Sequence, residues 1–202
     1  VTNMDIKALI LHLEDLVYHD THARIRQLYN TSIEENAQQF EAVHRAFAVQ
    51  DYYMIQGPPG TGKTTVIKEL IMQQLHANSS SKILVVSQAN VAVDNVIRGI
   101  QKLCRTENCI QESQIIRCGS DGKIAEDILP FSYNGRMETY TESLKTTNSV
   151  NPELRKKWIS FTESPDNRDI VSECLLKGYQ IIGATCVGFS NRNIGLSGLE
   201  FD

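Results

Sequence analysis

Short apolar runs alternate with amphipathic stretches through most of the chain. Apolar residues recur at helical spacing after residue 63 and again after residue 90, which predicts two helices with one buried face each. Short, predominantly apolar runs lie around these stretches, at 52–55, 83–86, 115–118 and 180–186. Such runs are typical of buried strands in a parallel sheet. Strands that alternate with helices favour a doubly wound α/β fold with right-handed crossovers.

The N-terminal residues also predict helices. Apolar side chains share one face over 4–17, with Asn3 available as a cap, which indicates an amphipathic helix. Ile25, Leu28 and Tyr29 are expected to continue it or to add a second helical turn. Ser32 and Glu35 form a capping-box pattern, so a further helix is expected from this point. Its buried side would carry Phe40, Val43 and Phe47.

The stretch from about 120 to 178 is polar and rich in turns. Asn151-Pro152 predicts the start of one helix, and Asp166 is expected to cap another. The basic cluster at 155–157 is interpreted as a solvated helix face in preference to a phosphate contact. We therefore expect a helical insertion on the α/β core and not a second domain.

Composition restricts the classes of function. The chain has 202 residues, 41% hydrophobic content and a formal net charge of −4, which suits a globular domain without an overall basic field. Any nucleic-acid site must therefore be local. Five cysteines form no C-x-x-C pair, which argues against a disulfide framework or a zinc site and favours reduced thiols in a cytoplasmic setting. No signal peptide is evident, and no apolar run approaches the length of a membrane span.

The chemistry is concentrated in one glycine-rich stretch. Gly57-Pro58-Pro59-Gly60-Thr61-Gly62-Lys63-Thr64, followed by Thr65, fits the phosphate-binding pattern G-x-x-x-x-G-K-[ST]. In such a loop backbone N–H groups surround the phosphate oxygens, and the N-terminus of the following helix faces the same anion. Lys63 would bind the β- and γ-phosphates, and the Thr64 hydroxyl would bind Mg²⁺. The stretch therefore predicts a nucleoside triphosphate site.

A second polar segment, Asn36-Ala37-Gln38-Gln39-Phe40, precedes the loop. A glutamine amide offers both a donor and an acceptor, as the N6/N7 edge of adenine requires. Taken alone, the segment is better explained as a solvated helix face, because glutamines on helices are usually solvated. Its position ahead of the loop and of the motifs that follow favours the adenine contact.

Together these motifs resemble those of superfamily 1 helicases, in the 1B branch of nonsense-mediated-decay and DNA-replication-type 5′→3′ enzymes. Residues 55–64 resemble the first motif of that branch, and Ser87-Gln88-Ala89-Asn90-Val91-Ala92-Val93-Asp94 is similar to its motif Ia. Ile182-Gly183-Ala184-Thr185-Cys186-Val187-Gly188 resembles the strand and turn before motif II, and 36–39 matches the adenine-reading Q motif with Gln39 as its glutamine. The motifs stand in the family's order.

The resemblance implies an ATP-dependent helicase with a RecA-like P-loop fold whose parallel sheet is incomplete in this chain. It divides the chain into an N-terminal helical stalk, 1–31, and a first motor domain, 32–202. Gln39 would select adenine, and Lys63 and Thr64 would hold ATP and Mg²⁺ for hydrolysis. Ser87, Asn90 and Thr185 would lie on the track of single-stranded DNA or RNA, because small polar side chains position a strand without reading its sequence.

Motif II, an apolar strand that ends in Asp-Glu, is the part of the family pattern that we do not find. It is expected close to Phe201-Asp202, but the acidic residues there follow no apolar strand, so Asp202 is not assigned as a Mg²⁺ ligand. A second motor domain with its arginine finger is also missing. Because the chain begins with Val1 and not Met, we expect a piece of a longer protein. Because these parts of the family pattern are not found, we expect the chain by itself to bind nucleotide and to hydrolyse it hardly at all.

Two other functions fit the phosphate loop alone. A nucleotide-dependent switch or assembly ATPase without helicase activity would keep the loop, but it has no evident need of motif Ia. A small-molecule kinase would leave both the Q motif and motif Ia unexplained. The sequence does not separate DNA from RNA, because contacts of this kind do not report on the 2′-hydroxyl.

Overall fold

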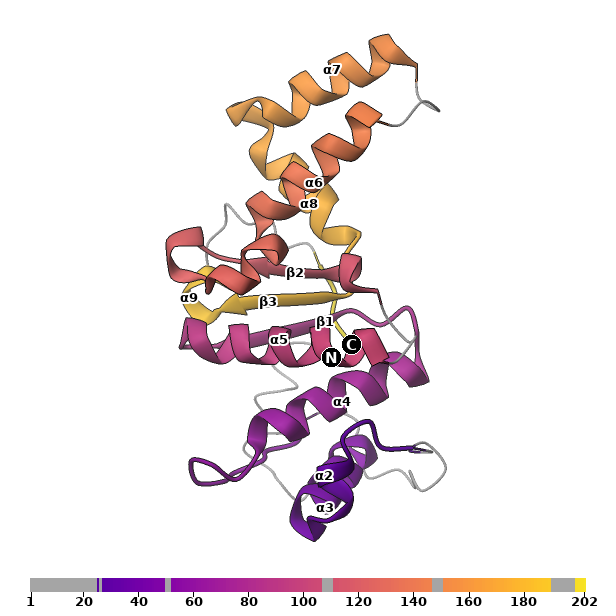
Figure 1. Ribbon diagram of the computed structural model, residues 1–202, viewed down its shortest axis with the longest axis vertical. Helices are drawn as coiled ribbons and strands as arrows, with labels where there is room; N and C mark the ends of the chain where they lie inside the picture. Colours follow the sequence, from indigo (N-terminus) through magenta and orange to yellow (C-terminus); the bar gives the residue numbers. More distant parts are fainter. Residues whose placement is uncertain (1–24, 26, 50–51, 107–110, 147–150, 190–198) are drawn as a thin grey trace. The chain divides into compact units, whose positions relative to one another are not determined.

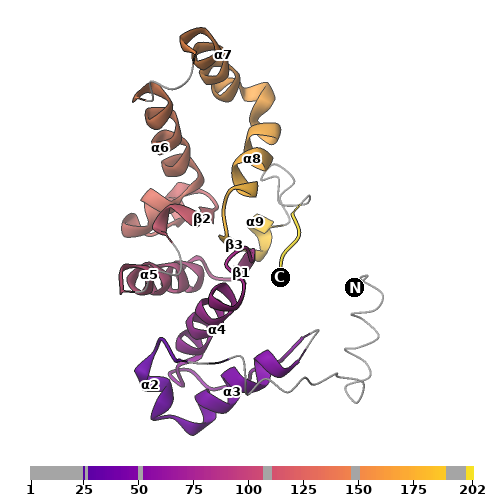
Figure 2. The same cartoon turned by 90° about the vertical axis from the view of Figure 1, so that its right-hand side faces the viewer.

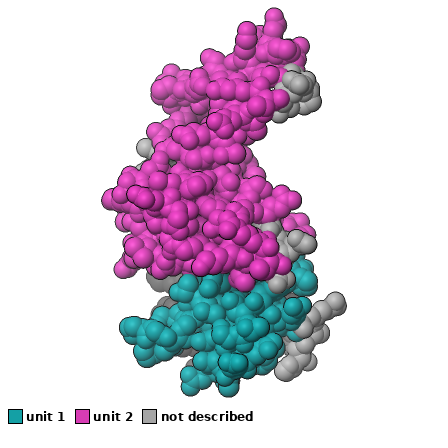
Figure 3. Space-filling view, in the orientation of Figure 1, with its two compact units in different colours: residues 1–78 teal, residues 79–202 magenta. Residues whose placement is uncertain are grey.

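The computed structural model describes residues 25, 27–49, 52–106, 111–146, 151–189 and 199–202 (Figure 1). The chain forms two compact units, Val1–Asn78 and Ser79–Asp202 (Figure 3), and each has its own apolar core. The helix predicted at 4–17 lies outside the described residues, and the domain boundary after residue 31 stays a prediction. Within the described ranges, no helix has both the length and the apolar character needed to cross a bilayer.

The described part of unit 1 contains the helices α2 (Thr31–Glu34), α3 (Ala37–Ala48) and α4 (Lys63–Ala77). Val43 of α3 and Val66 of α4 are buried in one cluster with Leu28 and Ile33. The predicted helix after the glycine-rich loop is confirmed. It ends at Ala77, and Asn78 forms its C-cap.

The helix predicted to start at Ser32 is wrong in its first turns. α2 ends at Glu34, and α3 starts only at Ala37 because Asn36 is extended and caps it. The Asn36 side-chain oxygen accepts a hydrogen bond from the Gln39 N–H at 3.1 Å. An asparagine side chain competes with helix continuation in this way.

Two further predictions in unit 1 are wrong. The residues at 25 and 27–30 are not helical, because the backbone N–H groups of Tyr29 and Asn30 bind the Glu69 side chain. The run at 52–55 is not a strand, and Met54 within it is exposed. A strand is held by hydrogen bonds to a neighbouring strand. No described strand pairs with this run.

Unit 2 is built on a parallel sheet of β1 (Ile83–Ser87), β2 (Ile115–Cys118) and β3 (Ile181–Thr185), in the order β1-β3-β2. These bounds confirm the three predicted strands to within one residue at each end, and the α/β class with them. β1 is not fully buried as predicted, since it lies at an edge of this described sheet and Val86 is 40% exposed.

Helices and loops cover both faces of this sheet (Figures 1 and 2). On one face lies α5 (Asn90–Thr106), in which Val93, Val96, Ile97 and Ile100 are buried. On the other face Ile116 and Ile182 are buried against Leu176, and Phe201 packs against the same cluster. The layers are therefore helix, sheet and helix, as a doubly wound fold requires.

Residues 120–178 are mainly helical. They form η3 (Asp121–Lys123), η4 (Glu126–Phe131), α6 (Tyr133–Thr146), α7 (Pro152–Glu163), η5 (Pro165–Asn167) and α8 (Arg168–Lys177). Figure 2 shows α6, α7 and α8 together at one end of unit 2. α7 starts as predicted, because the Asn151 side chain caps it and Pro152 takes its first position. Asp166 is not the predicted cap, since it lies in η5 and α8 follows Asn167. α6 was not predicted.

Candidate functional site

The glycine-rich loop of unit 1 ends at the N-terminus of α4. Gly60 and Gly62 have φ values of +82° and +80°, a left-handed conformation that residues with a Cβ rarely adopt. Gly62 is the N-cap of α4 and has no side chain to cap the first N–H groups. The first N–H groups of a helix have no acceptor within the helix, so this terminus is open to an anion.

Lys63, the first residue of α4, points its ammonium back to the loop. Its Nζ atom lies 2.5 Å from the Gly57 carbonyl oxygen and 2.7 Å from that of Pro58. Among the described residues, no carboxylate forms an ion pair with this ammonium. The charge is therefore held only by neutral carbonyl groups, which suits later transfer to phosphate. Thr64 follows at the second helical position and is exposed.

The other predicted residues of the loop stabilise its turn. The Thr61 hydroxyl donates to the Pro58 carbonyl oxygen at 2.9 Å, and the Thr65 N–H donates to the Gly62 carbonyl oxygen at 2.8 Å. Pro59 is exposed at the top of this turn. The loop is thus closed by its own hydrogen bonds before any ligand is considered.

Gln39 connects the polar segment at 36–40, here called the Q segment, to the glycine-rich loop. Its side-chain Nε2 donates to the Thr61 carbonyl oxygen at 2.9 Å. The cap by Asn36 fixes the backbone of this turn, so the glutamine is held from both sides. The structure therefore brings together the two segments that the sequence singled out for nucleotide. The amide keeps its oxygen and a second N–H for a base edge.

Glu69 is a functional candidate that sequence reasoning missed. It lies on the buried side of α4, is fully buried, and accepts hydrogen bonds from the N–H groups of Tyr29 and Asn30 at 2.9 to 3.1 Å. The side chains of Asn30 and Gln73 donate to the same carboxylate. This carboxylate ties the segment before α2 and α3 to the helix that follows the loop. A glutamate within an apolar stripe was the available signal, since a buried charge needs partners.

Ser87, Asn90 and Thr185 lie together at the carboxyl ends of the strands of unit 2. Ser87 and Thr185 are register partners in β1 and β3, and Asn90 begins α5. The Ser87 hydroxyl oxygen accepts from the Ala89 N–H at 3.4 Å, and the Thr185 hydroxyl oxygen accepts from the Gly188 N–H at 3.1 Å. Thr185 precedes the short helix α9 (Cys186–Phe189). Both hydroxyl hydrogens stay available to donate.

A hollow of about 1010 Å³ opens at this edge of unit 2. Asn90 and Thr185 line it, together with the loop at 119–123, Asn134 and Arg168. Ligands of open α/β sheets bind outside the carboxyl ends of the strands. Two of the predicted strand-binding residues, Asn90 and Thr185, therefore line a space that is large enough for part of a polymer chain.

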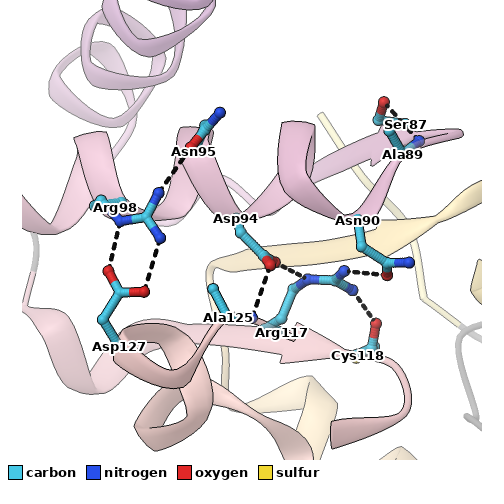
Figure 4. A network of polar contacts seen from close by, with 10 residues as sticks. All are labelled: Ser87, Ala89, Asn90, Asp94, Asn95, Arg98, Arg117, Cys118, Ala125 and Asp127. Atoms are coloured by element: carbon cyan, nitrogen blue, oxygen red, sulfur yellow. Dashed lines mark hydrogen bonds and ion pairs between the residues drawn. The ribbon is translucent and has the colours of Figure 1, made fainter. Parts of the chain in front are cut away.

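A buried arginine contacts Asn90, one of the residues that line this hollow (Figure 4). Arg117 of β2 is 0% exposed and forms an ion pair with Asp94 of α5, with 2.8 Å between Nε and Oδ1. Its Nη2 donates to Asn90 Oδ1 at 2.8 Å, and its Nη1 donates to the Cys118 carbonyl oxygen. In the sequence, Arg117 is one residue of the strand predicted at 115–118. A charge in such a strand predicts a buried counter-charge, and that signal was available.

Several pKa values in the described part of unit 2 depart from their ordinary range, among them those of Cys118, Asp127 and Arg136. Burial raises the pKa of Cys118 to about 12. Arg98 donates two hydrogen bonds to the Asp127 carboxylate, at 2.5 and 2.7 Å (Figure 4). These bonds hold the pKa of Asp127 below its usual value. Burial lowers the pKa of Arg136, which packs against Phe131 and Tyr179. None of these three groups lines the hollow.

The loop at a helix N-terminus and the parallel sheet together define the chain as a P-loop nucleotide-binding protein. A protein-family model described as an AAA domain matches residues 34–164, well over half of the chain. The chain belongs to this family.

Several relatives share parts of this sequence. The chain is similar to an ATP-dependent helicase of Methanocaldococcus jannaschii, described as uncharacterized, with 32% identity over 106 residues, 52% of this chain and 15% of that protein. It is similar to DNA-binding protein SMUBP-2 of Rattus norvegicus, with 36% identity over 100 residues, 50% of this chain and 9% of that protein. It is also similar to the ATP-dependent helicase upf1 of Schizosaccharomyces pombe, with 28% identity over 172 residues, 79% of this chain and 17% of that protein.

The chain thus spans only 9 to 17% of the lengths of these relatives. The family match and the relatives support the resemblance to the N-terminal motor region of superfamily 1 helicases.

Proposed function

We propose that the chain is the ATP-binding portion of an ATP-dependent DNA or RNA helicase or translocase that acts on single strands. The observation that carries this proposal is the open hollow at the carboxyl edge of the sheet, which Asn90 and Thr185 line and beside which Ser87 is the register partner of Thr185. A phosphate loop alone would fit many functions. The names of the relatives, which include ATP-dependent helicases and a DNA-binding protein, support the same choice.

The residues of unit 1 fit ATP with Mg²⁺. The helix terminus is uncapped and Lys63 has no acidic partner among the described residues, so this region is electropositive and suits a polyphosphate. Lys63 would bind the phosphates, and the exposed Thr64 hydroxyl would hold Mg²⁺, which supplies charge neutralisation when bound. Gln39 would bind the adenine edge with the amide atoms that its contact to Thr61 leaves over.

The strand edge of unit 2 would bind the sugar–phosphate backbone. Hydroxyl and amide donors match phosphate oxygens and carry no information on base sequence. This tolerance is what a motor that moves along a strand needs. We further propose the division into a stalk, 1–31, and a first motor domain, 32–202. Hydrolysis in the complete protein would then also need motif II and an arginine finger from a second motor domain.

ATP hydrolysis by the complete protein tests this function. The account predicts that single-stranded DNA or RNA stimulates hydrolysis severalfold, and that Lys63→Ala lowers the stimulated rate by about 100-fold or more. The competing function, a nucleotide-dependent switch or assembly ATPase, predicts equal rates with and without nucleic acid. Equal rates would therefore contradict the helicase proposal.

A further inference from the structure

The Asn90 carboxamide is oriented by a group that can only donate hydrogen bonds. The Arg117 guanidinium lies 2.8 Å from the Asn90 side chain, and the atom that faces it is Oδ1. A guanidinium has no acceptor, so the amide oxygen must point to it. Figure 4 shows the Asn90 nitrogen on the side away from Arg117. Asn90 therefore presents a donor, and not an acceptor, on its other side.

That donor belongs to a residue that lines the hollow at the carboxyl edge. The oxygens of a nucleic-acid phosphate only accept hydrogen bonds, so they match an N–H and would be repelled by the amide oxygen. An unrestrained asparagine would present either end of its amide. The contact with Arg117 removes the unfavourable orientation before the strand arrives.

Arg117 cannot perform this binding itself. It is 0% exposed, and its charge is compensated by Asp94, which is 2% exposed. The second Asp94 oxygen accepts a hydrogen bond from the Ala125 N–H at 3.0 Å. The ion pair thus connects α5, β2 and the segment that follows Gly119, and α5 and that segment both contribute residues to the hollow. It lies behind the surface that a strand would contact.

We propose that Arg117 and Asp94 are positioning residues that hold Asn90 as a hydrogen-bond donor toward a backbone phosphate of single-stranded nucleic acid. The proposal rests on the proposed function, because it needs a strand at this edge. It adds that the affinity for the strand depends on a buried ion pair that touches neither strand nor nucleotide.

The test measures binding of fluorescent oligo-dT and oligo-U to the complete protein as a function of salt. Asn90→Ala is expected to weaken binding about 5- to 10-fold, the effect of one lost hydrogen bond. The apolar pair Asp94→Leu/Arg117→Met keeps the net charge and the packing volume, and such replacements of buried ion pairs are often tolerated. It is expected to cause the same loss, and adding Asn90→Ala to it is expected to cause no more.

Three further measurements separate positioning from other roles. The slope of log affinity against log salt is expected to stay unchanged in these variants, because no phosphate loses a cation. The double variant Arg98→Gln/Asp127→Asn is the control. It removes the solvent-accessible ion pair between α5 and η4 and also leaves the net charge of the protein unchanged. It is expected to bind single strands as wild type does. Arg117→Lys keeps a charge beside Asp94 but lacks the fork that reaches Asn90, so it is expected to match Asn90→Ala even if the double variant does not fold.

The outcomes are distinct. Three results would overturn the positioning role. The first is wild-type affinity for the strand in both Arg117 variants, and the second is a loss of affinity in these variants that multiplies with the loss in Asn90→Ala. The third is a slope of log affinity against log salt that is reduced by about one phosphate contact. Wild-type affinity in Asn90→Ala would overturn it too, while strand binding as such would stand. A complete protein that binds no single strand would overturn the proposed function, and this inference with it.

Discussion

The Gln39 side chain donates a hydrogen bond to the Thr61 carbonyl oxygen at 2.9 Å, so the Q segment and the phosphate loop form one structure. Gly62 makes this contact possible, because a Cβ at that position would lie 2.4 Å from Gln39 Nε2. The colliding atom is the end of a flexible side chain, so an added methyl group would displace the glutamine. The loop glycine and the glutamine are therefore coupled.

This coupling predicts that Gly62→Ala lowers the preference for adenine over guanine nucleotides as Gln39→Ala does, about 5- to 10-fold for one hydrogen bond. Gly60→Ala is the matched control, because Gly60 has a similar φ of +82° but nothing within 4 Å of its added Cβ. Both alanines cost about 1–2 kcal/mol of backbone strain. Competition between adenine and guanine nucleotides measures the preference. Equal selectivity in Gly60→Ala and Gly62→Ala would contradict the coupling.

Glu69→Gln is predicted to loosen the segment before α2. The substitution places an NH₂ group among donors and leaves buried N–H groups short of an acceptor, at a cost of about 1–3 kcal/mol. Hydrogen exchange at the amides of Tyr29 and Asn30 should accelerate accordingly. Glu41→Gln is the control, because Glu41 is 59% exposed and its pair with Arg45 is worth less than about 1 kcal/mol. Unchanged exchange in Glu69→Gln would mean that the carboxylate does not hold this segment.

The sequence predicted the strands of unit 2 well because each is a short, nearly unbroken apolar run. It predicted α4 and α5 for a related reason, since their stripes repeat at helical spacing. The sequence did not predict α6 because none of its side chains is buried, so its residues form no apolar stripe at helical spacing. Residues 52–55 have the composition of a strand, but strand formation depends on a partner that a local pattern cannot report.

The candidate site shows the same division. The loop, Gln39 and motif Ia are recognisable because ligand contacts require particular residue types at fixed spacing. Glu69 and the pair of Arg117 and Asp94 bring together residues far apart in the sequence. Their roles depend on tertiary structure. The only signal in the sequence was the presence of charged residues in otherwise apolar segments.

Gly183→Ala is predicted to destabilise unit 2 by about 1–3 kcal/mol, the usual cost of overpacking. A Cβ there would lie 2.7 Å from Ile97 Cδ1 and 2.8 Å from Val93 Cγ1, both on the helix that covers β3. Gly122→Ala is the control, because its Cβ would meet nothing within 4 Å. Urea unfolding followed by circular dichroism gives the difference. Equal stability of the two variants would show that α5 does not pack this closely on β3.

The Cys118 thiol is predicted to resist alkylation. Burial raises its pKa from 9.0 to about 12, so the reactive thiolate at pH 8 is about 1000-fold rarer than in an ordinary cysteine. Cys174 is exposed and serves as the internal control. Because the folded state holds this proton more tightly, the associated stability is complete below pH 9 and declines as the pH rises toward 12. Peptide mass spectrometry after iodoacetamide treatment measures both thiols, and equal labelling would contradict the burial of Cys118.

The claim that the loop and Gln39 form one adenine-nucleotide site is tested most directly by binding of fluorescent ADP and an ATP analogue with Mg²⁺. The account predicts adenine-selective binding that Lys63→Ala weakens by about 10-fold or more, because a charge-assisted contact to phosphate is lost. Lys68→Ala, further along α4, is predicted to bind as wild type does. Equal affinity for adenine and guanine nucleotides, or wild-type affinity in Lys63→Ala, would contradict the account.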